Sequence, residues 1–151
     1  MKLARVSFPG SGGQSLAARL DLPDAAPSAF ALFAHCFTCG KDVFAATRIS
    51  QQLATHGVAC LRFDFTGLGS SEGEFANTNF SSNVADLLAA AAHLRQAYQA
   101  PALLIGHSLG GAAVLAAAAS VPDCRAVLSG SAAADSQKSR FLQVSVWNRR
   151  K

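Results

Sequence analysis

The feature that most constrains this chain is a serine, Ser108, with a glycine two positions before it and another two positions after it, Gly106 and Gly110. The apolar residues 101–105 lead into this motif, and the alanine-rich residues 109–120 follow it. Such an apolar run favours a buried strand, and such an alanine-rich run favours a helix. The chain therefore has to turn sharply from strand to helix at the serine, and the glycines let the two elements pass each other closely.

A turn of this kind, a nucleophile elbow, presents a serine hydroxyl above the carboxyl edge of a sheet. The backbone N–H of Leu109 then lies at the start of a helix, where it stabilises developing negative charge. Because a strand precedes the motif and a helix follows it, the match is more specific than a chance pentapeptide. We predict that Ser108 is a nucleophile and that Leu109 donates to an oxyanion. His107 borders this site, but adjacent residues on a tight turn point apart, so His107 is a poor base for the serine.

The rest of the chain alternates strand-like and helix-like segments. Residues 2–8 and 14–22 flank a Gly-rich turn and predict an antiparallel hairpin. Mostly unalternating apolar runs, typical of strands buried on both faces of a parallel sheet, follow at residues 29–34, 58–63, 102–105 and 126–128. Helices are predicted between them at residues 44–56, 82–98 and 109–120. We expect Ser82 or Asn83 to cap the second helix. This order predicts an α/β domain of three layers, with a mostly parallel sheet and an N-terminal antiparallel hairpin.

Three further segments carry a resemblance to a known family: Phe33–Cys39 (FAHCFTC), Arg62–Gly69 (RFDFTGLG) and Glu74–Asn83 (EFANTNFSSN). Together with the serine motif, they make the chain resemble the α/β-hydrolase superfamily over residues 2–128. More narrowly, the chain is similar to the hydrolase half of bifunctional bacterial proteins in which this domain precedes an OsmC-type peroxide-reducing domain. Nothing in the chain resembles the OsmC half. The resemblance implies an α/β-hydrolase fold and a serine hydrolase of esterase or peptidase type, with an acyl-enzyme formed through Ser108.

In this superfamily the loop after the first buried strand supplies a second N–H donor that faces the serine. Here that loop carries His35, Cys36 and Phe37. The backbone of Phe37 is the expected second oxyanion donor, and that of Cys36 is the next choice. We expect His35 to border the site and to pin the loop by hydrogen bonding rather than to carry protons.

The triad of the superfamily runs in the order serine, acid, histidine. All four histidines of this chain, His35, His56, His93 and His107, precede Ser108. A serine hydroxyl without a base is a weak nucleophile. We therefore expect weak or no turnover from this chain alone and a hydrolase fold that is incomplete at its C-terminus. The alternative is a non-catalytic truncated hydrolase that acts as a binding module or is an inactive fragment.

Charge divides the chain into two parts. Residues 1–128 hold eight Lys/Arg and eight Asp/Glu, whereas residues 129–151 hold five and one, so the net charge of +4 lies in the tail. Residues 129–140 have no apolar period, whereas the apolar residues within 141–147 suit either one short strand or an irregular cover. We interpret residues 129–151 as a poorly specified basic segment after a partial hydrolase core at residues 1–128. Such a tail is more often a solvated end than a nucleic-acid arm, so no nucleic-acid partner is predicted. The expected ligand is a small acyl or ester-type molecule, and an exposed sheet edge would favour self-association.

The sequence shows no signal peptide and no apolar stretch long enough to span a bilayer, which predicts a soluble, cytoplasmic protein without a membrane partner. Its cysteines are Cys36, Cys39, Cys60 and Cys124. A cytosolic compartment keeps such cysteines as thiols. The spacing of Cys36 and Cys39 also fits zinc and redox sites, but no second close pair completes a zinc site, so neither metal nor cofactor is predicted. Thiol chemistry of this pair in peroxide defence, suggested only by the family resemblance, is a third alternative.

Overall fold

The computed structural model describes residues 1–36, 39–132 and 142–148. A seven-stranded sheet has the order β1-β2-β4-β3-β5-β6-β7. Its strands are β1 (Lys2–Pro9), β2 (Ser15–Leu22), β3 (Ala29–Ala34), β4 (Val58–Phe63), β5 (Leu103–His107), β6 (Ala126–Ala132) and β7 (Leu142–Asn148). The helices are α1 (Phe44–Thr55), α2 (Phe80–Ala97) and α3 (Leu109–Ala117), with single 3₁₀ turns at Phe75–Asn77 and Ala118–Ser120.

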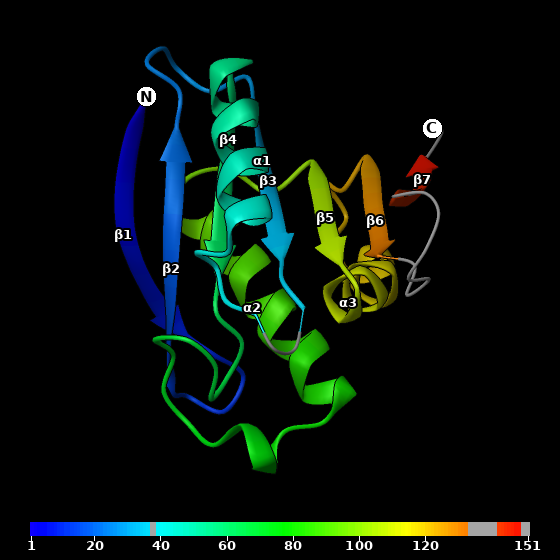
Figure 1. Cartoon of the computed structure of the whole chain (residues 1–151). Coiled ribbons are helices and arrows are strands. Elements are labelled where there is room, and N and C mark those ends of the chain that lie inside the picture. Colours follow the sequence, from blue (N-terminus) through cyan, green and yellow to red (C-terminus); the bar gives the residue numbers. More distant parts are fainter. Residues whose placement is uncertain (37–38, 133–141, 149–151) are drawn as a thin grey trace.

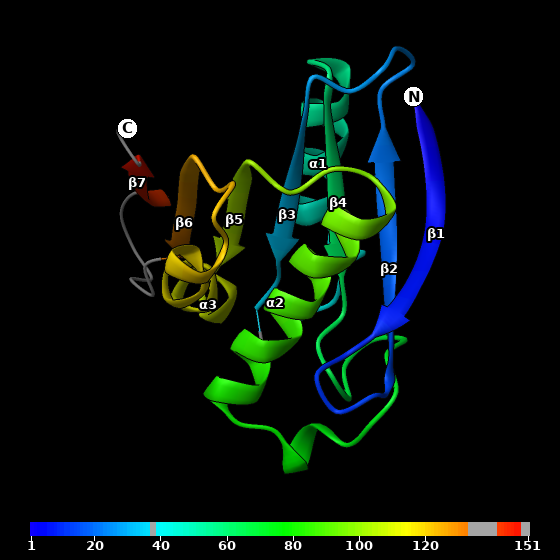
Figure 2. The same ribbon diagram turned by 180° about the vertical axis from the view of Figure 1, so that it is seen from behind.

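The sheet is the middle of three layers. Helix α1 lies on one face of the sheet (Figure 1), and α2 and α3 lie on the opposite face (Figure 2). The neighbouring strands β4, β3, β5 and β6 run parallel, and β1 and β2 form the antiparallel hairpin that continues the sheet beyond β4. The predicted α/β-hydrolase architecture is therefore confirmed.

Apolar burial on both faces explains why the central strands lack alternation. In β3, Phe30, Leu32 and Ala34 belong to the larger core cluster, which includes the inner faces of α2 and α3. The intervening Ala31 and Phe33 belong to a smaller cluster with Ala46 of α1. Complete burial of a large apolar side chain stabilises a fold by about 1.5–3 kcal/mol. Removing either helical layer would therefore expose half of each central strand.

Helix α2 begins earlier than the sequence predicted, and its predicted cap is wrong. Asn79 is the N-cap: its side chain accepts from the N–H of Ser82 at 2.9 Å, and the Ser82 hydroxyl accepts from the N–H of Asn79 at 2.9 Å. This reciprocal pair is a capping box. Asn83, one of the two expected caps, is instead fully buried on the inner face of the helix. The run 80–82 continues the helical geometry because Asn79 satisfies its first free N–H groups.

The segment after residue 128 contains more strand than expected. Strand β6 continues to Ala132, and β7 pairs with it antiparallel from Ala126 opposite Asn148 to Ala132 opposite Leu142. Of the short strand and the irregular cover that the sequence allows near the end of the chain, the strand is present. The outer edge of β6 is hydrogen-bonded to β7.

None of the helices in the described part of the chain is both long enough and apolar enough to cross a membrane.

The capping box predicts a measurable contribution to stability. Replacing Asn79 by alanine removes the acceptor for the N–H of Ser82, and we expect a loss of about 1 kcal/mol in the free energy of unfolding, measured by urea denaturation. Ser81→Ala is the matched control, because Ser81 is an exposed residue of the same first turn. Equal effects of the two substitutions would contradict the capping role of Asn79.

Candidate functional site

Ser108 lies in the turn between β5 and α3. Its φ of 56° makes it the only non-glycine residue of the described chain in the left-handed region. Side chains rarely adopt this conformation, so it persists only where the surroundings impose it. Ser108 is exposed, while its N–H donates to the carbonyl of Gly130 in β6 at 2.7 Å. The turn is thus tied to the sheet through its backbone and presents its side chain outward.

Two glycines allow this turn. A Cβ at Gly106 would overlap the backbone of Gly110, and a Cβ at Gly110 would overlap the carbonyl of Ala34 and lie 2.7 Å from the carbonyl oxygen of His35. These neighbours are backbone atoms and have no side-chain freedom with which to make room. The requirement for glycine at both positions is therefore steric, as the motif predicted.

The same contacts place the loop after β3 beside the start of α3. Ala34 is opposite Gly106 in the register of β3 and β5, and these strands end at the same edge of the sheet, where α3 begins (Figure 1). His107 is half-buried at the end of β5 and is opposite Gly130 of β6. The predicted site residues His35, Cys36, His107 and Ser108 thus meet at one sheet edge. Phe37 lies outside the described residues.

His35 is buried, and both of its ring nitrogens are engaged. Nδ1 contacts the carbonyl oxygen of Cys36, and Nε2 lies 3.4 Å from the N–H of Phe65. Since Phe65 N–H donates, Nε2 is the acceptor and Nδ1 carries the proton that it donates to Cys36. Burial lowers the pKa of His35, although the bond to Cys36 and the carboxylate of Asp64, 3.8 Å away, partly oppose this shift. A neutral His35 therefore holds the loop and is not oriented to accept a proton from Ser108.

A buried ion pair anchors the other end of this loop. Asp64 accepts from the N–H of Lys41 at 2.6 Å, from Lys41 Nζ at 2.7 Å and from the N–H of Ser70 at 2.9 Å. Both charged side chains are almost fully buried. In the sequence analysis Asp64 appears only within the segment that carries the family resemblance, and this ion pair was not predicted. An acidic residue directly after a buried strand was the available signal.

A second buried ion pair lies deeper, between the sheet and α1. Arg62 Nε donates to Asp21 at 3.0 Å, and another Arg62 nitrogen donates to the carbonyl of Lys41 at 2.5 Å. Arg62 interrupts an otherwise apolar strand run, which was a signal of a buried polar contact. Through Lys41, this pair connects β2 and β4 to the loop that borders the site.

The cysteine prediction is wrong for two of the four residues. Cys36 and Cys39 form a disulfide with a Cα–Cα distance of 5.2 Å, and the Cys39 N–H donates to the Cys36 carbonyl at 3.2 Å. Cys60 and Cys124 are buried and do not belong to a disulfide, and burial raises the pKa of the Cys60 thiol to about 12. Within the described residues, no group of three or more His, Cys, Asp or Glu side chains is arranged to hold a metal ion.

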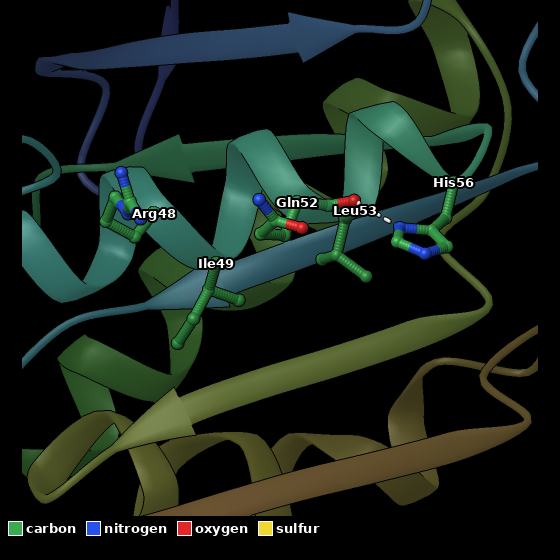
Figure 3. Close-up of a pocket in the computed structure, with 5 residues that line it drawn as sticks. All are labelled: Arg48, Ile49, Gln52, Leu53 and His56. Atoms are coloured by element: carbon green, nitrogen blue, oxygen red, sulfur yellow. Dashed lines mark hydrogen bonds between the residues drawn. The ribbon is translucent and has the colours of Figure 1, made fainter.

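A separate hollow of about 320 Å³ lies along α1 and is lined by Arg48, Ile49, Gln52, Leu53 and His56. Figure 3 shows these side chains along the helix, with His56 hydrogen-bonded to the carbonyl of Gln52. None of the predicted site residues lines this hollow. It is an apolar surface feature distinct from the turn at Ser108.

The sequence model of a family described as serine aminopeptidase, S33, matches residues 27–151. The chain belongs to this family of α/β-hydrolases. As an S33-family chain, it shares its fold with solved hydrolases of the superfamily.

Its relatives include esterases and a thioesterase. The esterase domain of a Rhodothermus marinus protein is 55% identical with a TM-score of 0.70, covering 85% of this chain and 50% of that one. XC6422 from Xanthomonas campestris, described as an α/β serine hydrolase without a lid, is 26% identical with a TM-score of 0.71, covering 80% of this chain and 57% of that one. Human mitochondrial palmitoyl-protein thioesterase ABHD10 is 37% identical over 91 residues, which are 60% of this chain and 29% of that protein. The S33-family chain thus spans between 29% and 57% of the lengths of these relatives.

The close approach at Gly110 predicts a strong steric effect. In Gly110→Ala, the new methyl group meets backbone oxygens of the β3 loop, and we expect a loss of about 3 kcal/mol in the free energy of unfolding. Ala112→Ser, an exposed change in the same helix, should stay within about 0.5 kcal/mol of the parent. Similar denaturation midpoints for the two variants would show that α3 can move away from the β3 loop.

The neutral state of His35 predicts a pH dependence of stability. Because burial lowers the pKa of His35 from its ordinary value of 6.5, the unfolded chain binds more protons than the native one below that pH. The free energy of unfolding should therefore fall as the pH is lowered through 6.5 and towards the native pKa. In His35→Gln this fall should be smaller, as measured by urea denaturation between pH 5 and 7 (roughly the histidine range). His56→Gln, which replaces an exposed histidine just after α1, is the control.

Proposed function

We propose that this chain carries the nucleophile and oxyanion half of a serine hydrolase that acts on small acyl esters or thioesters. The observation that supports this most strongly is the conformation of Ser108, an exposed serine in the left-handed region at a strand-to-helix turn. Strain of this kind is characteristic of functional sites, and a fold that needed only a tight turn would use glycine here.

In the proposed reaction, Ser108 Oγ attacks the acyl carbonyl and the alcohol or thiol leaves, so that an acyl-enzyme forms. The backbone N–H of Leu109, the first residue of α3, donates to the oxyanion, since the first N–H groups of a helix have no partner within it. The second donor comes from the loop after β3, through Phe37 or Cys36. An esterase domain and a palmitoyl-protein thioesterase among the relatives support an acyl substrate bound through oxygen or sulfur.

We further propose that residues 1–151 alone turn over such substrates slowly. No histidine follows Ser108 in the sequence, and both nitrogens of His35 are engaged elsewhere. Across the described residues, no hydrogen bond joins the Ser108 hydroxyl to a histidine or a carboxylate. Binding and an oxyanion hole without a complete triad still give roughly 10³–10⁴-fold acceleration over water. This is the level of ester hydrolysis that we expect.

The second candidate is a non-catalytic module that binds acyl ligands. The same observation, a serine with no base in contact, favours it. The two functions differ in one respect: only the hydrolase forms a covalent bond between Ser108 and an electrophile.

Labelling with a fluorophosphonate probe tests this difference. We expect slow labelling of the parent chain, none in Ser108→Ala and unchanged labelling in Ser120→Ala, which alters another exposed serine. Hydrolysis of a p-nitrophenyl ester should follow the same order. Absence of labelling from a folded, monodisperse parent protein would overturn the hydrolase proposal and favour the binding module.

A further inference from the structure

We propose that Cys36 and Cys39 are a reversible dithiol–disulfide pair whose oxidation state controls the sheet edge at Ser108. One part of this proposal, the effect on acyl transfer, rests on the proposed function of Ser108. The other part, the exchange itself and its effect on the structure of the edge, does not.

The position of the pair connects it to the candidate site. Cys36 is the second residue after β3. The residue before it, His35, has its carbonyl oxygen so close to Gly110 that a Cβ there would lie 2.7 Å from it. A change in the backbone at Cys36 is therefore transmitted directly to the first turn of α3, where the Leu109 N–H lies.

Buried contacts fix the chain on both sides of the pair. Before it, the ring of His35 donates to the carbonyl of Cys36. After it, Lys41 is held by Asp64 through its backbone N–H at 2.6 Å and its ammonium group at 2.7 Å. The pair can thus open and close between two anchors while the core on either side stays packed.

Accessibility separates this pair from the other cysteines. Cys36 and Cys39 are half-buried, whereas Cys60 and Cys124 are buried, so a small thiol should reach the first pair more readily. The Cys39 N–H donates to the Cys36 carbonyl at 3.2 Å, and the Cα atoms of the two residues are 5.2 Å apart, within the usual disulfide range. The raised pKa of Cys60 further suppresses its thiolate. We therefore expect thiol–disulfide exchange only at the Cys36–Cys39 pair.

Thiol–disulfide exchange is a two-electron step with two molecules of a small thiol, reduced glutathione, as reductant. The thiolate of the first molecule attacks the sulfur of Cys36 or Cys39 and forms a mixed disulfide, which releases the other cysteine as a thiolate. The thiolate of the second molecule then attacks the glutathione sulfur of the mixed disulfide and displaces the remaining cysteine. Two electrons and two protons pass to the pair, and the reductant leaves as a disulfide. A disulfide oxidant such as oxidised glutathione reverses the reaction.

The oxidised form should hold the edge more firmly. A cross-link between the two residues restricts the backbone of Cys36, one of the two proposed loop donors to the oxyanion. Loss of an oxyanion donor lowers a rate by about 10²–10³-fold, and a loosened donor costs part of that. We therefore expect fluorophosphonate labelling of Ser108 to be about tenfold faster in the oxidised than in the reduced form.

The exchange is measured on the whole chain in glutathione buffers of graded ratio. Trapping of free thiols with an alkylating reagent, followed by mass spectrometry, should show Cys36 and Cys39 becoming alkylated together as the buffer becomes reducing. Cys39→Ser should abolish this transition, whereas Cys124→Ala should retain it. A pair that is fully alkylated, or fully protected, at every ratio would overturn the proposal.

Hydrogen exchange of the two forms tests the structural effect without relying on Ser108 chemistry. Amides of residues 35–42 and 109–111 should exchange more slowly in the oxidised form, and Cys39→Ser should show no dependence on the buffer. Identical amide hydrogen exchange in both forms would overturn the control of the sheet edge, even if Cys36 and Cys39 change oxidation state across the glutathione ratios. If amide hydrogen exchange differs between the two forms but Ser108 is labelled in neither, the proposed hydrolase function fails while the redox control of the edge stands.

Discussion

The close approach of α3 to the end of β3 is the constraint on which the rest of the site depends. Gly110 lies against backbone carbonyls of the β3 loop, and this contact is possible only because no side chain intervenes. The approach forces Ser108 into the left-handed region and brings the start of a helix to the sheet edge. Strain, exposure of the serine and alignment of the first helical N–H groups are thus consequences of one packing contact.

Buried charges hold the surroundings of this contact in place. The pairs of Asp64 with Lys41 and of Asp21 with Arg62 lie in an otherwise apolar domain. Removal of one partner from such a pair leaves an uncompensated charge and is strongly destabilising, whereas the net gain from an intact pair is small. Their main effect is therefore on position: both pairs hold Lys41, in the loop between β3 and α1.

The proposed chemistry follows from the groups at this sheet edge, a strained serine and a helix N-terminus, and from the engagement of His35 elsewhere. It presents an exposed, conformationally strained serine beside the N-terminus of a helix, which suits attack on an acyl carbonyl and stabilisation of the resulting oxyanion. Both nitrogens of the nearby His35 are used in holding the loop. In the proposed site, this edge supplies the oxyanion donors and the nucleophile of a hydrolase. Among the described residues no base contacts Ser108, and a disulfide forms part of the border.

The sequence by itself determined the architecture and the position of the strained serine. Unalternating apolar runs and the glycines around Ser108 are local patterns, and each has one strong structural solution. The tertiary structure alone decided the cap at Asn79, the pairing of β6 with β7, the Lys41–Asp64 pair and the disulfide. These features depend on distances between residues that local periodicity does not encode, or on a competition between neighbouring polar groups that only the folded backbone resolves.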